Sequence, residues 1–304
     1  MKKTTILFSI TFLLATCCFA QQLEKSKADS LRDAGDLIKA IEVYAELYKE
    51  NPANKSNTYN YACALALNHQ IDTAFHYLNI ATANDTSVQA LNDPDFYYLT
   101  KDKRWADVEN TLVERVEAKF GKYEDLALSK ELWKMKITDQ AFYYHVEIAD
   151  KLTERNRVVT SAIWETKELL NQKNVARIEE IIDEKGWPKK SIIKGSAAST
   201  VFLVIQHADI AIQEKYLPLM REAADAGEAN WSSLALLIDR VNLRQGKEQI
   251  YGSQINRKED GSFYVNDLQE PEYVNQRRAE VGLGPIEEYV KHWGMEWTVS
   301  QKSK

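Results

Sequence analysis

The chain has few cysteines, and their positions rule out one way of stabilising a fold. Its 304 residues include three cysteines, and two of them, Cys17 and Cys18, fall in an expected leader. Cys63 would be the one cysteine left after the leader is cleaved, so no intrachain disulfide is expected. The mature chain must therefore be held together by its hydrophobic core, and its length is ample for one or two domains.

The chain also lacks an excess of basic residues, a long apolar run and the common catalytic motifs. Acidic residues outnumber basic ones by 45 to 39, which argues against binding to nucleic acid or to an anionic membrane. No segment reaches the roughly 20 apolar residues of a membrane span. The sequence has no glycine-rich phosphate loop, no nucleophile elbow and no paired cysteines, so we predict no cofactor.

The segment 1–20 resembles a secretory signal peptide. It comprises a positive start, an apolar run and small residues before a cleavage site, namely Lys2 and Lys3, Ile6–Ala15, and Cys18 and Ala20. Cleavage would remove two lysines and move the net charge from −6 to about −8. The segment Leu14–Cys17 also has the outline of a lipobox, but Thr16 is a poor residue before a lipidated cysteine. We therefore expect an exported protein, periplasmic or secreted, rather than a lipid-anchored one.

Apolar and small residues recur at a constant spacing in the next part of the chain. The matching pairs, each 34 positions apart, are Ala28 and Ala62, Leu31 and Leu65, Ala40 and Ala74, Tyr44 and Leu78, and Leu47 and Ala81. With the helical pattern of residues 35–52, this period resembles tetratricopeptide (TPR) repeats. One further period leads to Phe96, Leu99, Val108 and Leu112, so we expect residues 89–120 to form a degenerate, capping third repeat. The sequence predicts a TPR-like α-solenoid over residues 21–120.

The resemblance assigns five positions of the first helices to a concave groove: Lys25, Asp29, Tyr59, Cys63 and Tyr97. These residues lack the Lys/Asn/Arg clamp of chaperone-tail binders, so the expected partner is a protein or peptide but not a free carboxyl terminus. Neither His nor Lys flanks Cys63 to lower the pKa of its thiol. We expect Cys63 to be a small buried residue.

Residues 121–304 lose this period and predict a second helical domain that carries a small β-hairpin. The expected helices cover residues 124–151 (as one or two helices), 156–170, 174–185, 195–209, 211–226, 230–244, 272–280 and 286–292. The hairpin would pair residues 249–255 with 262–265 around a turn at 256–261. The predicted fold class is therefore mostly α.

Several short polar motifs in this part have a recognisable order and spacing. They are Asp139-Gln140, Gly186-Trp187-Pro188, Gln206-His207-Ala208-Asp209, Asp239-Arg240, Gln249-Ile250-Tyr251-Gly252-Ser253-Gln254 and the segment Arg277–Leu283. Together they resemble a bacterial domain of unknown function, the family numbered six-six-two-four, over roughly residues 128–290. The resemblance implies no activity. It also shows one departure, because an arginine often follows the Asp-Gln pair where this chain has Phe142-Tyr143.

The same motifs supply the candidate site residues. A carboxylate beside His207 would orient its ring as a general base, so the predicted catalytic set is His207, Asp209, Asp239 and Arg240. The predicted ligand-binding residues are Gln206, Gln249, Tyr251, Gly252, Gln254, Asp139 and Gln140. No metal site is predicted, since the pairs His207/Asp209, His145/Glu147 and His69/His76 give it little support. These residue types equally suit a structural network that ties a hairpin onto helices.

Two functions remain open from the sequence. The first is an exported interaction protein whose repeats bind a protein or peptide. The second is an enzyme, a hydrolase, with His207 as the general base of a C-terminal domain that would take a small ligand. The leading hypothesis is the interaction protein, because its motif has a known physical use. A cluster that converges on a solvent-accessible pocket would favour the enzyme, and a buried, mutually satisfied cluster would favour architecture.

Overall fold

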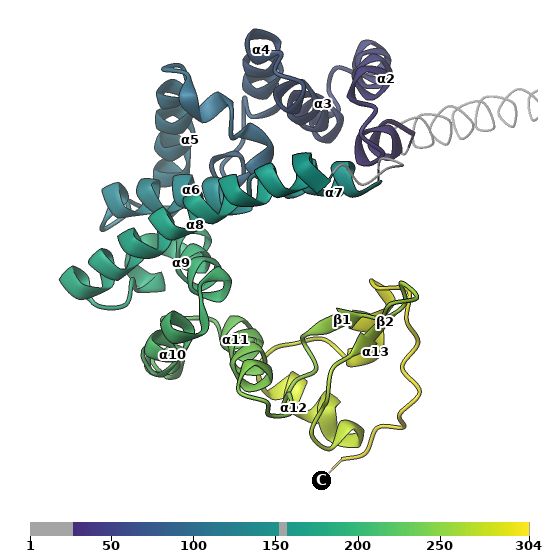
Figure 1. The fold of residues 1–304 in the computed structure, drawn as a ribbon. Helices are drawn as coiled ribbons and strands as arrows, with labels where there is room; N and C mark the ends of the chain where they lie inside the picture. Colours follow the sequence, from purple (N-terminus) through teal and green to yellow (C-terminus); the bar gives the residue numbers. More distant parts are fainter. Residues whose placement is uncertain (1–26, 152–156, 304) are drawn as a thin grey trace, which may run out of the picture. The chain divides into compact units, whose positions relative to one another are not determined.

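The computed structural model describes residues 27–151 and 157–303 (Figure 1). The expected signal peptide and Lys25 lie outside the described residues. The chain divides into two compact units, which are described separately: Met1–Lys122 with Gln140–Glu168, and Tyr123–Asp139 with Leu169–Lys304. Within the described residues, none of the helices combines the length and the apolar character that crossing a membrane requires.

The first unit is built from helices and short 3₁₀ turns. After a helical stretch at residues 27–33 come α2 (Leu37–Glu50), α3 (Lys55–Leu67), α4 (Ile71–Ala81), η1 (Ala90–Asn92), η2 (Pro94–Phe96), η3 (Leu99–Lys101), α5 (Trp105–Phe120) and α7 (Tyr143–Lys151). Figure 1 shows α3 lying between α2 and α4. Asp36 and Asn54 begin α2 and α3 by accepting backbone N–H groups with their side chains, as helix caps do.

The residues that recur every 34 positions are buried in this unit, except for the half-buried Leu31. Ala28 and Ala62 are fully buried, as are Ala40 and Ala74. Small side chains at these positions allow neighbouring helices to pack closely, and large buried residues such as Tyr44 fill the space between them. The burial pattern thus follows the period that the sequence predicts.

The third period begins differently. Residues 90–101 form three short 3₁₀ turns instead of an α-helix. Pro94 has no N–H to donate, and the Asp93 carboxylate accepts the N–H of Asp95, so the local chemistry favours a tight turn. Phe96 and Leu99, two apolar positions of the expected third repeat, are nevertheless fully buried.

The second unit is also mostly helical and ends in a small sheet. Its elements are α6 (Leu126–Gln140) and α8 (Arg157–Lys185), which both cross the division between the units, then α9 (Lys190–His207), α10 (Ile210–Asp225), α11 (Trp231–Arg244), β1 (Ile255–Arg257), β2 (Phe263–Val265), η4 (Pro271–Tyr273), α12 (Val274–Glu280) and α13 (Ile286–Lys291). The mostly helical fold with a small two-stranded antiparallel sheet near its end is confirmed.

Two helix boundaries differ from those the sequence predicts. We expected separate helices over 156–170 and 174–185, but α8 runs continuously from Arg157 to Lys185 because that segment contains no proline or glycine. Helix α9 begins at Lys190, ahead of the predicted start at Gly195. Lys194 has non-helical angles (φ 61°, ψ 161°), so the helix is broken next to the predicted start.

The hairpin is shorter than expected. Ile255–Arg257 pairs antiparallel with Phe263–Val265, with Asn256 opposite Tyr264. Residues 249–254, predicted to belong to the first strand, are irregular apart from a bridge between Gln249 and Leu268. Three of their backbone N–H groups bond to a buried side chain rather than to a neighbouring strand.

Candidate functional site

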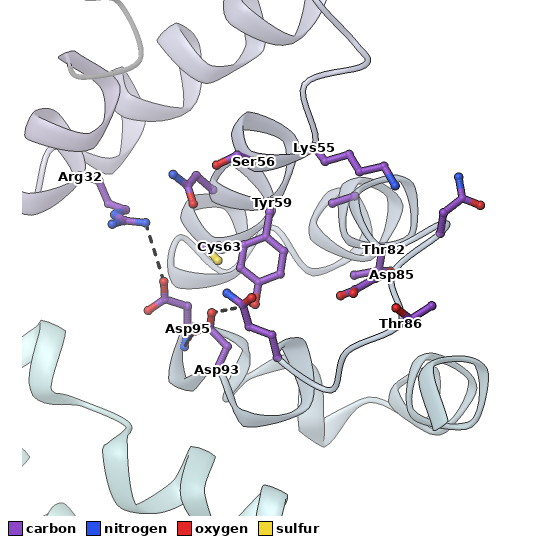
Figure 2. Close-up of a pocket in the computed structure, with 14 residues that line it drawn as sticks. Arg32, Lys55, Ser56, Tyr59, Cys63, Thr82, Asp85, Thr86, Asp93 and Asp95 are labelled. Atoms are coloured by element: carbon purple, nitrogen blue, oxygen red, sulfur yellow. Dashed lines mark hydrogen bonds and ion pairs between the residues drawn. The ribbon is translucent and has the colours of Figure 1, made fainter. Parts of the chain in front are cut away.

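A cavity of about 590 Å³, which we call the polar cavity, lies in the first unit where residues of α3 meet the loop after α4 (Figure 2). It is lined almost entirely by polar side chains: Arg32, Lys55, Ser56, Tyr59, Asn60, Cys63, Thr82, Asn84, Asp85, Thr86, Gln89, Asp93 and Asp95, with Ala81. Two of the predicted groove residues, Tyr59 and Cys63, are among them. Its volume is within the range of about 300–1,000 Å³ that small-ligand sites occupy.

One end of the polar cavity carries two carboxylates with different partners. The Tyr59 hydroxyl donates to Asp93 Oδ2 at 2.8 Å. Arg32 Nη1 lies 4.0 Å from Asp95 Oδ2, as Figure 2 shows, and the Arg32 side chain is half-buried there. Two acidic side chains gather at this end of the cavity, which suits a positively charged guest group.

Burial shifts the acid-base properties of the same groups. It raises the pKa of Asp95 to about 6, with repulsion from Asp93 as the second cause. Burial also raises the pKa of the Cys63 thiol well above its ordinary value, and Cys63 is only 2% exposed. Both shifts disfavour the negatively charged form of the group, so this part of the cavity disfavours additional negative charge.

Cys63, Asp93 and Asp95 each place a ligand atom within 4.8 Å of the others. Metal binding would require the Cys63 thiolate, whose formation burial opposes. The three side chains therefore fit better as part of a polar cavity wall than as a metal centre.

The remaining predicted groove positions have other surroundings. Asp29 accepts hydrogen bonds from the Tyr44 hydroxyl and, at 3.2 Å, from Asn60 Nδ2, so its carboxylate joins the helices of this unit. Tyr97 lines a smaller cavity together with Gln140, one of the predicted ligand-binding residues.

In the second unit, His207 is paired with a carboxylate from another helix. Its Nδ1 lies 2.9 Å from Asp139 Oδ2; Asp139 is fully buried, and the His207 side chain is 18% exposed. Asp209, the predicted orienting group, instead caps α10 by accepting the N–H of Ile212 at 3.0 Å. The carboxylate seen on the His207 ring is thus that of Asp139, since α9 ends at His207 and Asp209 begins the next helix.

Asp239 is the centre of a different network. Its fully buried carboxylate accepts three backbone N–H groups, from Ile250 at 2.7 Å, Tyr251 at 3.0 Å and Ser253 at 2.9 Å. The hydrogen bonds compensate the buried negative charge of the carboxylate, and they also give the buried backbone N–H groups an acceptor. Asp239 thereby fixes the irregular segment before the hairpin.

Two arginines bind the carbonyl groups of the same segment. Arg277 Nε donates to the Ile250 carbonyl at 2.8 Å, and Arg278 Nη1 donates to the Tyr251 carbonyl at 2.8 Å. Arg278 is 3% exposed, and burial lowers the pKa of its guanidinium. Carboxylate and guanidinium groups thus satisfy opposite sides of one stretch of backbone.

The glutamines and the glycine of this segment have the same structural role. The fully buried Gln249 accepts the Gln254 N–H at 2.7 Å and donates to the carbonyls of Gln254 and Asn266. Gly252 has φ +66°, and a Cβ there would lie 2.8 Å from Ile286 Cδ1. Only glycine fits this backbone conformation and this close approach.

The remaining predicted residues also lie close to backbone. Arg240 Nη1 lies 3.4 Å from the Gln206 carbonyl, which also accepts Gln213 Nε2 at 2.8 Å. Tyr251 is half-buried, and burial raises the pKa of its hydroxyl. The cluster therefore separates into a backbone-holding network around Asp239 and a His207–Asp139 pair.

Five charged residues of the polar cavity were not predicted from the sequence: Arg32, Lys55, Asp85, Asp93 and Asp95. The Asp93-Pro94-Asp95 sequence was the available signal, since an Asp before proline begins a tight turn and exposes polar groups. Arg277 and Arg278 were noticed only as part of a motif, because their partners are backbone atoms that a sequence does not reveal.

Comparison with protein families gives a match over most of the second unit. The model of the Family of unknown function (DUF6624) matches residues 126–302. No curated protein and no solved structure matches the chain.

Proposed function

Because the chain belongs to DUF6624, a family whose function is unknown, we propose its function from the site alone: it binds a peptide segment of a partner protein through the polar cavity of the first unit. In this proposal residues 21–120 are TPR-like repeats that present the cavity, and the DUF6624 domain is attached to them. The family match supplies no reaction, so the proposal depends on the polar cavity.

The observation that carries the proposal is the arrangement of the cavity's α3 residues. Ser56, Tyr59, Asn60 and Cys63 all line the cavity, and their spacing of three or four places them on one face of α3. The repeat period assigns Tyr59 and Cys63 to the concave face of TPR-like repeats. The burial of the small residues that recur with this period supports the same arrangement.

The lining indicates what kind of peptide would fit. Amide and hydroxyl groups such as Asn60 and Thr86 suit the backbone of an extended chain, which carries an N–H and a C=O at each residue. Asp93 and Asp95 favour a basic side chain, because both carboxylates lie at one end of the cavity. We therefore expect an extended peptide with at least one Lys or Arg.

Selection from a displayed library of random peptides tests this proposal. The bait is the chain from Gln21 onward, and the affinity of a selected peptide is then measured by fluorescence anisotropy. Replacing Ser56 and Gln89, both exposed at the cavity, by alanine should weaken binding by about tenfold. The matched control is Lys49→Ala, whose side chain is 68% exposed and does not line the cavity. Failure to select a peptide, or equal loss in the control, would contradict the proposal.

We further propose that the protein acts after export, because residues 1–20 have the three parts of a signal peptide. Cell fractionation tests this directly. The processed chain should appear in the periplasm or the medium, and an unprocessed chain confined to the cytoplasm would contradict it.

The His207–Asp139 pair supports a second candidate, a hydrolase. A buried carboxylate on Nδ1 orients an imidazole, and 18% of the His207 side chain remains exposed. His207→Ala should abolish hydrolysis of any ester or amide in a substrate panel that the wild type cleaves. His292→Ala, at an exposed histidine bonded to the Tyr289 carbonyl, should leave it unchanged. Absence of hydrolysis across the panel, or activity retained in His207→Ala, would remove this candidate.

A further inference from the structure

A second cavity in the first unit, which we call the aromatic cavity, has a different lining. It has a volume of about 240 Å³ and lies between residues 94–98 and residues 140–147. Aromatic rings dominate its wall: Tyr97, Tyr98, Phe142, Tyr143, Tyr144 and His145. At this volume it is smaller than most ligand pockets, which suits a single head group or side chain.

The rings stand at steep angles to one another, as adjacent walls of a box do. Tyr98 and Phe142 have centroids 6.5 Å apart and planes at 89°, and Tyr97 and Phe142 are 5.0 Å apart at 63°. Tyr98 and His145 are 6.3 Å apart at 76°. Tyr97, Tyr98, Phe142 and His145 are all half-buried. Rings in this arrangement surround a volume from several sides.

The aromatic cavity has two carboxylates in its lining, and each has a basic neighbour. Arg32 Nη1 lies 4.0 Å from Asp95 Oδ2, and Lys151 Nζ lies 2.6 Å from Glu147 Oε1. The other titratable side chains of the lining are tyrosines and His145. Burial is the main cause that lowers the pKa of His145, with His69 as the second, so its ring is neutral at neutral pH and does not repel a cation. Lys101, outside the lining, already places its Nζ 4.3 Å from the centroid of Tyr97.

Phe142 is held at this cavity against a backbone preference. Its φ of +71° belongs to the left-handed region, which a bulky side chain rarely adopts, and it lies at the break between α6 and α7. Glycine would fit this backbone with less strain. The conformation accompanies an aromatic side chain at the cavity wall, and such strain concentrates at functional sites.

We propose that the aromatic cavity binds a quaternary ammonium group. Such a group has no N–H to donate, so it is recognised mainly by aromatic faces, which line this cavity. The inference does not depend on the peptide proposal, because it concerns a second cavity with its own rings, although Asp95 lines both cavities. Free choline-like compounds and a trimethylated lysine side chain share this chemistry.

Isothermal titration of the chain from Gln21 onward tests the proposal. The two ligands are choline and its neutral isostere, in which a tert-butyl group replaces the trimethylammonium head. Choline should bind at least about tenfold more tightly than the isostere, because the shapes are equal and only the charge differs. Equal binding of the two, or no binding of choline, would overturn the proposal.

Variants assign the binding to this cavity. Phe142→Gly removes the ring while fitting the left-handed backbone, and should weaken choline binding by about tenfold. Phe142→Tyr keeps a ring, and Phe120→Ala removes an exposed one elsewhere in this unit; both should bind as the wild type does. Thermal unfolding followed by circular dichroism identifies any variant that fails to fold, and Tyr98→Leu then provides a second test of the aromatic cavity. Wild-type choline affinity in both Phe142→Gly and Tyr98→Leu would overturn the assignment.

A trimethyllysine peptide and its unmodified lysine counterpart identify the natural source. Tighter binding of the trimethylated peptide than of choline would indicate a protein partner, whereas the reverse order would indicate a small molecule. Either order supports a quaternary ammonium site, and preference for unmodified lysine over both would contradict it. Phe142→Gly should leave affinity for a peptide selected on the polar cavity unchanged, so the two proposals fail separately.

Discussion

The carboxylate of Asp239 accepts the backbone N–H of Ser253 at 2.9 Å, from a position with no exposed surface. The same carboxylate accepts the N–H groups of Ile250 and Tyr251, while Arg277 and Arg278 bind the carbonyls of those two residues. The most conspicuous polar motif of the DUF6624 domain is thus satisfied internally. It holds a segment of chain, which leaves the cavities of the first unit and His207 as the candidates for ligand binding.

Replacing Asp239 by alanine should strongly destabilise the second unit. The change leaves three backbone donors without their acceptor, and losses of this kind total about 3–5 kcal/mol. Urea denaturation measures it. Asp260→Ala is the control, since that exposed carboxylate only binds Ser262 in a turn and should unfold close to the wild-type midpoint. Equal effects of the two variants would refute the role of Asp239.

Alanine substitutions at two glycines distinguish the cost of backbone strain from the cost of steric overlap. Gly252→Ala should cost about 2–4 kcal/mol, because φ is +66° and the new Cβ would lie 2.8 Å from Ile286 Cδ1. Gly282→Ala has a similar φ of +74° but nothing within 4 Å of the new Cβ, so it should cost only about 1–2 kcal/mol. Urea denaturation compares them, and an equal loss would show that Ile286 moves aside freely.

The stability of the first unit should depend on pH through Asp95. Burial raises its pKa from 3.8 to about 6, so ionisation disfavours the folded form. The contribution of Asp95 is therefore fully present below pH 3.8 and is lost as the pH rises through about 6. Relative to Asp95→Asn, which does not titrate, the wild type should lose about 2 kcal/mol between about pH 4 and pH 7. A pH-independent difference, or one of opposite sign, in urea titrations would contradict this.

Cys63 should resist thiol reagents in the native protein. It is 2% exposed, so a reagent hardly reaches its sulfur atom. Burial also raises the pKa of its thiol, so little of the reactive thiolate forms. In a chain with Cys17 and Cys18 replaced by serine, modification by an aromatic disulfide reagent at about pH 8 should be at least about a hundredfold slower than in urea. Rapid stoichiometric modification of the folded chain would show that the polar cavity opens to Cys63.

Most helices were predictable from the sequence because their signals are local. The period that places Ala28 and Ala62, and the glycine that follows α10, depend on nearby residues alone. The continuity of α8 was missed because polar residues at 171–174 resemble a break in hydrophobicity although nothing there stops a helix. The predicted domain boundary at residue 121 stays a prediction, and the structure groups residues 140–168 with the first unit.

The candidate site was harder to predict, because its contacts join distant positions. Sequence proximity pairs His207 with Asp209, but the carboxylate that reaches the ring is Asp139, 68 residues away. Asp239 was given a catalytic role, since a sequence does not reveal that three backbone N–H groups converge on one carboxylate. Residue types indicated that the segment matters without indicating why.

A single selected peptide, titrated by anisotropy on two variants of the chain, separates the two candidate binding units most directly. Binding to the Ser56→Ala, Gln89→Ala double variant should be about tenfold weaker, and binding to His207→Ala should keep the wild-type affinity. That result would place recognition in the polar cavity of the first unit. Wild-type affinity in the double variant with loss in His207→Ala would contradict the peptide proposal and place the site in the DUF6624 domain.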